Sequence, residues 1–194
     1  MSDYTYTVSY WPADDDAAKN PALDFAAIRK QADTPHYLGV RVEEPPFAFL
    51  STLKSAASPA HATLSDVLPS AAKAGLKTIT VTYATNPTET LSGKLVEHAF
   101  VHPREGVDKA ALVEWGERGA DALKAAGAEV CNAATYGTVL EESDAVILLI
   151  GWESFDVHRA WTAEGGPGRE LLLDLFAKID RPRLFASHVS YTKY

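Results

Sequence analysis

The chain contains almost no cysteine: Cys131 is the single one among 194 residues. An internal disulfide is therefore excluded. Cys131 follows Glu129 and Val130 in a segment that is predicted to be a strand. A thiol in such a place is expected to be buried and inert rather than a nucleophile.

Long apolar runs are also absent, and none approaches the roughly 20 residues that a membrane-spanning helix needs. The first residues, MSDYTYTVSYW, contain neither the basic region nor the apolar stretch of a signal peptide. The sequence therefore predicts a soluble, cytoplasmic protein.

Positive charge is scarce, with 18 Lys and Arg against 26 Asp and Glu, which gives a net charge of −8. The basic residues are scattered and form no stripe. This balance argues against nucleic acid or an anionic membrane as a general partner. A composition that is 46% hydrophobic and 23% charged indicates a packed core rather than disorder.

The most informative stretch is AVILLIGWESFDVHRAW, residues 145–161. Its first six residues form an unbroken apolar run of the length expected for a buried central strand. Gly151 and Trp152 end that run. The next large side chains recur at helical spacing: Phe155, His158 and Trp161. The pattern predicts a strand that passes directly into a helix, with a tryptophan and a histidine held at the junction.

The motif GWES followed by H-x-x-W resembles the strand-to-helix junction of the dimeric α/β-barrel superfamily. That superfamily includes antibiotic-biosynthesis monooxygenases, stress-responsive barrel proteins, polyketide cyclases and haem-degrading enzymes. The similarity is greatest to the fungal-type members. Membership of such a superfamily implies a fold but does not by itself fix a reaction.

Two similar sets of elements follow one another along the chain. In the first half, strands are predicted at 4–10, 37–43, 47–53 and 76–83, and helices at 21–29 and within 59–75. Residues 11–16 are expected to be a loop. In the second half, strands are predicted at 94–101, 130–140, 145–152 and 184–191, and helices at 107–126 and 155–179. Residues 86–92 are the expected linker.

The halves also agree in local sequence, since residues 39–44 align with 137–142 and residues 80–83 with 188–191. We therefore predict an α+β fold made of two fused ferredoxin-like β-α-β-β-α-β units. The units span residues 1–88, which have diverged most, and 89–194, which we expect to hold the ligand site.

Burial explains why two units would be fused. One unit covers one face of its sheet with helices and leaves the other face bare, which is unstable in water. Single-unit relatives pair two chains into a barrel. Here both sheets lie on one chain, so we predict an intramolecular barrel, a pseudo-dimer that is either a monomer or a homodimer in solution.

The barrel interior is the expected cavity, and the second half contains four of the six histidines. His98, Phe100 and His102 alternate along one strand and should share a face. His188, on the closing strand, could approach them if its register allows. We predict His158 and His98 as general bases. The predicted ligand-binding residues are Trp152, Tyr136, His102, His188 and Phe100. The alternative is that these side chains are packing, loop or capping groups.

No metal or other cofactor is predicted. His98 and His102 would lie about 13 Å apart along a strand, too far to share one ion. Alternation sends Glu97 to the opposite face. The haem-degrading relatives carry an axial histidine about three turns into the following helix, where this chain has residues 163–165, AEG. Residues 165–168, GGPG, lack the Lys-Ser/Thr of a phosphate loop.

Together these features predict binding of a small apolar or aromatic, polyketide-like molecule. If the protein is an enzyme, the resemblance implies cofactor-independent cyclisation, isomerisation or oxygenation. The alternative is a non-enzymatic, stress-responsive barrel protein. A cavity of several hundred Å³ reached by two histidines would favour the first function. A barrel filled with Phe, Leu and Trp would favour the second.

Overall fold

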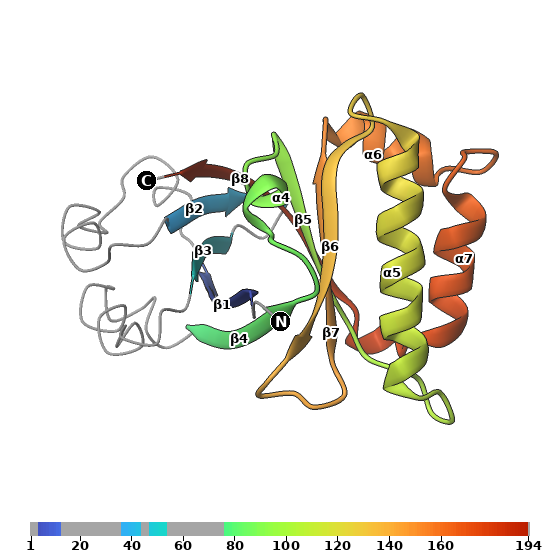
Figure 1. Cartoon of the computed structure of the whole chain (residues 1–194), viewed down its shortest axis with the longest axis horizontal. Coiled ribbons are helices and arrows are strands. Elements are labelled where there is room, and N and C mark those ends of the chain that lie inside the picture. The colour runs from blue at the N-terminus through green and yellow to red at the C-terminus, as the bar shows by residue number, and fades with distance from the viewer. Residues whose placement is uncertain (1–3, 13–35, 44–46, 54–75, 194) are drawn as a thin grey trace.

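A computed structural model describes residues 4–12, 36–43, 47–53 and 76–193 (Figure 1). Eight antiparallel strands close into a barrel in the order β1-β3-β2-β8-β5-β7-β6-β4. The strands are β1 (Tyr4–Pro12), β2 (His36–Arg41), β3 (Phe47–Leu53), β4 (Lys77–Tyr83), β5 (Leu95–Val101), β6 (Cys131–Val139), β7 (Val146–Trp152) and β8 (Phe185–Lys193).

Helices cover the outer face of the β5–β7 side of the barrel (Figure 1). They are α5 (Lys109–Ala126), α6 (Phe155–Thr162) and α7 (Arg169–Lys178), and α7 is followed by the 3-10 helix η1 (Arg181–Arg183). The short helix α4 (Thr88–Leu91) lies apart from them on the barrel side (Figure 1). Among the described residues, no helix is long and apolar enough to cross a membrane.

Local sequence explains where the two helices nearest the site begin and end. The Asp108 side chain accepts a hydrogen bond from the Ala110 N–H and caps α5, which stops at Gly127 with φ of 92°. The Ser154 hydroxyl accepts a hydrogen bond from the Val157 N–H and caps α6. The chain can therefore turn from β7 into α6 within three residues.

All seven residues of β7 are buried because both faces of this strand are covered. On β5, Val96 and Phe100 face the barrel interior, whereas Ala99 and Val101 pack beneath the helices. The chain thus has two cores, one inside the barrel and one between the sheet and the helices.

Side chains of the described residues pack into the barrel interior. The buried cluster there includes aromatic and branched residues from both halves of the chain: Tyr6, Val8, Tyr37, Val81, Tyr83, Val96, Phe100, Ile147, Leu149 and Val189. Among the described residues, side chains thus occupy part of the interior in which the sequence predicts an open cavity. A hollow of about 470 Å³ remains at one mouth.

The predicted α+β class is confirmed, and the described strands match the predicted ones to within a few residues. Residues 11–12 are an exception, because they extend β1 and pair with β3. Pro12 is tolerated there because the β1–β4 ladder has already ended at Tyr10. The predicted linker contains α4, whose Leu91 packs into the barrel core. Both predicted helices of the first half lie outside the described residues.

Candidate functional site

An apolar hollow of about 250 Å³ lies between the outer face of the sheet and helices α5–α7. We call it the helix–sheet pocket. Its walls are mainly leucine, isoleucine and aromatic side chains, including Trp115, Leu148, Ile150, Trp161 and Leu175. One wall is polar and consists of Glu97, His158 and His188.

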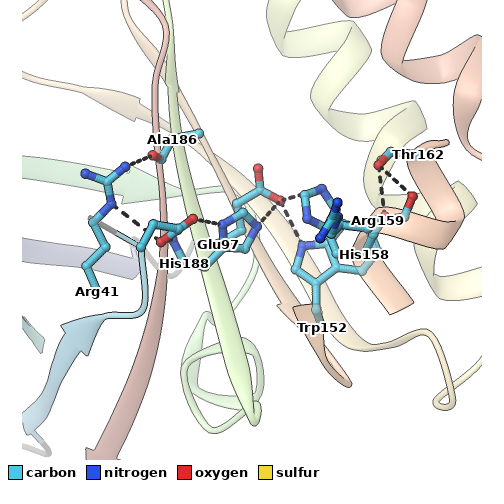
Figure 2. A network of polar contacts seen from close by, with 9 residues as sticks. Arg41, Glu97, Trp152, His158, Arg159, Thr162, Ala186 and His188 are labelled. Atoms are coloured by element: carbon cyan, nitrogen blue, oxygen red, sulfur yellow. Dashed lines mark hydrogen bonds and ion pairs between the residues drawn. The ribbon is translucent and has the colours of Figure 1, made fainter. Parts of the chain in front are cut away.

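Strand register brings this polar wall together. Glu97 on β5 pairs directly with His188 on β8, so both side chains leave the same face of the sheet. Trp152 is the last residue of β7, and His158 follows in the first turns of α6. Figure 2 shows the side chains of Trp152, His158 and His188 converging on Glu97.

Glu97 is the centre of the cluster, with a side chain only 12% exposed. The Trp152 Nε1–H donates a hydrogen bond of 2.8 Å to Glu97 Oε2. The same oxygen lies 3.9 Å from His158 Nε2 and 3.7 Å from His188 Nε2. A half-buried carboxylate is thus held by one indole donor and faced by two imidazole rings.

The opposite edge of His188 is fixed by the first half of the chain. Its Nδ1 contacts Glu43 Oε1, and its backbone N–H donates a 3.0 Å hydrogen bond to Glu43 Oε2. Arg41 Nε lies 3.5 Å from that second oxygen (Figure 2). Burial would raise the pKa of Glu43, but the hydrogen bonds and charge of His188 outweigh it and lower that pKa.

His158 is stacked among other rings. Its ring centroid lies 4.6 Å from Trp152 and 4.7 Å from His188. Burial lowers the pKa of His158, and the nearby Glu97 carboxylate only partly opposes this. Its Nδ1 is buried without a hydrogen-bond partner in the described part of the chain. A neutral imidazole at the wall of an apolar pocket can accept a proton near pH 7.

His98 faces the barrel interior and is fully buried. Its Nε2 lies 2.8 Å from the Tyr191 hydroxyl, and burial lowers its pKa to about 3. His98 pairs with Ser187 rather than with His188, so the two histidines point to opposite faces of the sheet. The approach of His188 to His98 that the sequence allowed therefore does not occur.

Phe100 and His102 line the mouth of the barrel rather than the helix–sheet pocket. His102 Nε2 lies 3.3 Å from Glu142 Oε2, and its Nδ1 lies 3.4 Å from Asp144 Oδ2. Phe100 packs beside Tyr10 and Phe185. These two predicted ligand residues thus share a cavity with each other and not with Trp152.

Tyr136 does not shape the helix–sheet pocket. It lies on β6 beneath α5, where a Cβ atom on Gly116 would come within 2.8 Å of its ring. Glycine at position 116 is what allows helix and ring to pack so closely. Burial, and then the carboxylates of Glu117 and Asp121, raise the pKa of Tyr136. It borders a separate open groove.

No protein-family model and no curated protein matches the sequence. Several solved structures are similar to the structure of this chain. A monooxygenase-like protein from Fusobacterium nucleatum superposes with a TM-score of 0.61 at 8% identity, over 98% of this chain and 94% of that chain. A monooxygenase-like protein from Lactobacillus acidophilus superposes with a TM-score of 0.60 at 8% identity, over 97% of this chain and 94% of that chain. An anthrone oxidase-like protein superposes with a TM-score of 0.61 at 11% identity, over 98% of this chain and 92% of that chain.

The chain has the fold of monooxygenase-like proteins. Identities this low show a shared fold and do not carry over any residue's role. The function must therefore be argued from the residues of the helix–sheet pocket itself.

Sequence reasoning missed one carboxylate that lines this pocket, Glu97, and a second that holds His188 from behind, Glu43. Glu97 was set aside because alternation turns it away from His98, and Glu43 was not considered. Alternation along β5 and β8 was available from the sequence, but only their register places Glu97 and His188 on one face. Glu43 gave no comparable signal, because it follows β2 and reaches His188 only through the pairing of β2 with β8.

Proposed function

We propose that the helix–sheet pocket binds a small apolar or aromatic molecule and gives the protein an oxygenase-like role, with His158 as the general base. The observation that carries this proposal is the position of the His158 ring, whose centroid lies 4.6 Å from that of Trp152 at the wall of an apolar hollow. Apolar pockets with a few convergent polar groups are the usual small-molecule sites. The monooxygenase-like neighbours support the same class of ligand.

The chemistry needs no cofactor if the substrate is a carbon acid. His158 would take a proton from an activated methylene, and dioxygen would add to the resulting carbanion. Return of the proton and loss of one water from the hydroperoxide would leave a ketone. One dioxygen is consumed and one water is released. An apolar pocket favours the neutral base and shields the carbanion from solvent.

A second function is favoured by the packing of the described side chains inside the barrel. Aromatic and branched side chains from both halves occupy it, as expected of a stress-responsive protein that acts through stability or partners. The two functions differ in one respect, because only the first requires the helix–sheet pocket to accept a ligand.

We further propose that the chain is a fusion of two ferredoxin-like units, residues 1–88 and 89–194. The strand orders support this: β4-β1-β3-β2 in the first half and β8-β5-β7-β6 in the second are the same order. A cytoplasmic pseudo-dimer, monomeric or homodimeric, remains our prediction for the intact protein.

Anthrone is a suitable probe, because one structural neighbour is an anthrone oxidase-like protein and anthrone is a flat aromatic carbon acid. We expect the protein to consume dioxygen with anthrone and to form anthraquinone. His158→Gln keeps hydrogen bonding but is a far weaker base, so it should abolish turnover while preserving the fold. His158→Phe keeps ring volume and should also be inactive.

Dioxygen uptake and product absorbance measure the reaction, and circular dichroism checks each variant's fold. Full activity in His158→Gln would exclude His158 as the base. If the wild-type protein neither binds nor oxidises anthrone or related anthraquinone precursors, the non-enzymatic function is favoured.

A further inference from the structure

The polar wall of the helix–sheet pocket combines two imidazoles and one carboxylate from three different elements. A ligand atom from each of Glu97, His158 and His188 lies within 4.8 Å of the other two. In a tetrahedral zinc site with bonds of about 2.1 Å, neighbouring ligand atoms lie about 3.4 Å apart. The Glu97–His188 separation of 3.7 Å and the Glu97–His158 separation of 3.9 Å are already close to that value.

We propose that Glu97, His158 Nε2 and His188 Nε2 bind one divalent transition-metal ion at the wall of the pocket. Two imidazoles with one carboxylate suit zinc or iron(II), whereas magnesium and calcium prefer all-oxygen sites. Three protein ligands leave a coordination position free, and all three residues line the pocket, so that position would open toward it.

The orientation of His188 is the strongest argument for a cation. Its Nδ1 contacts the Glu43 carboxylate, so Nδ1 is the nitrogen that carries the hydrogen. Its Nε2 then faces Glu97 Oε2 at 3.7 Å. This Nε2 is buried and has no hydrogen-bond partner in the described part of the chain. A metal ion between Nε2 and the carboxylate would give both atoms a partner.

The residues around the three proposed ligands hold those ligands in place, as residues around metal sites do. Glu43 holds the far nitrogen of His188, as carboxylates do for metal-bound histidines. Arg41 in turn pairs with Glu43, and the Trp152 indole N–H fixes Glu97. The charged groups in this network are the Glu97 and Glu43 carboxylates and the Arg41 guanidinium. These three groups together carry a net charge of −1, which favours an added cation.

Metal binding does not depend on the proposed oxygenase role. It would compete with that role, however, because a metal on His158 would remove the free base. Zinc is therefore expected to inhibit any turnover that uses His158, and a chelator should restore it.

The test uses the tag-free full chain after treatment with a chelator. Cobalt(II), a spectroscopic substitute for zinc, should bind at one equivalent with visible absorption typical of a four- or five-coordinate ion. Zinc should displace it and raise the unfolding temperature. Glu43→Gln, which leaves all three ligands in place, should weaken binding about 10–100-fold. Glu97→Gln and His188→Gln should weaken it further.

His102→Gln is the matched control. His102 is a buried histidine between two carboxylates, yet it lies at the barrel mouth, so this variant should bind cobalt as the wild type does. The proposal is overturned if wild-type protein binds no cobalt or zinc at micromolar concentrations. It is also overturned if folded Glu97→Gln and Glu43→Gln variants bind as tightly as wild type. The measurement contains no substrate, so failure of the oxygenase role would leave its result unaffected.

Discussion

At the residue scale, the two faces of β5 place histidine chemistry in two very different environments. His98 lies in the closed interior with Tyr191 as a partner, whereas Glu97, its neighbour in sequence, meets His158 and His188 at a pocket. Two neighbouring residues of β5 therefore differ in surroundings: His98 lies in the barrel interior, and Glu97 lies at the candidate site. The sequence predicts the same role, general base, for His98 and His158.

The buried state of His98 predicts a pH dependence of stability. Its pKa is about 3 in the folded protein, against an ordinary value of about 6.5 in the unfolded chain. Between these values only the unfolded chain binds the proton, so stability is full above about pH 6.5 and falls as the pH is lowered. One such group contributes a slope of about 1.4 kcal/mol per pH unit.

Denaturant unfolding between pH 7 and pH 4.5, with a chelator present, measures this slope. His98→Gln should reduce the slope by the contribution of one titrating group, about 1.4 kcal/mol per pH unit. We expect this reduction even if the variant is less stable at every pH. An unchanged slope in that variant would show that His98 is protonated equally in both states.

At the scale of elements, the sequence predicted what depends on local period and failed at what depends on register. The apolar run of β7 and the helical spacing after Ser154 are local patterns, and both elements form where expected. The pairing of Glu97 with His188 joins strands 91 residues apart in sequence. Their relative register is fixed only when the barrel closes, and a one-residue slip would reverse the face of either side chain.

Helix α6 offers a test of how one capping residue positions the site. Ser154 supplies the only side-chain cap of this helix in the described structure, and His158 lies one turn further on. Ser154→Ala should lower the free energy of unfolding by about 1 kcal/mol. It should also weaken cobalt binding, because the first turn of α6 would hold the His158 ring less firmly.

Ser154→Asp is the matched control, since aspartate caps helices as well as serine does. It should keep both stability and cobalt affinity near the wild-type values. Equal losses in the alanine and aspartate variants would show that the cap does not position His158. Denaturant unfolding and cobalt titration provide the two readouts.

At the scale of the whole molecule, the two halves share the barrel core and two seams, β2–β8 and β4–β6. Residues 1–88 expressed alone would leave the inner face of their sheet bare and both seams open. We expect this fragment to be insoluble or to self-associate. Co-expression with residues 89–194 should recover a soluble complex of one copy of each.

Size-exclusion chromatography with light scattering distinguishes these outcomes. A folded, monomeric fragment of residues 1–88 would contradict the proposed pseudo-dimer. Recovery of the complex would also restore the contact of Glu43 with His188, so cobalt binding should return with it.

The position of β8 has a consequence for the order in which the protein can fold during its synthesis. This strand is the last of the eight to leave the ribosome, yet it lies between β2 and β5 and joins the two halves. Until it emerges, β2 and β5 each present an unpaired edge, and the aromatic interior stays open to water. The growing chain therefore carries an incomplete, aggregation-prone barrel until β8 has emerged, and only then can the barrel close.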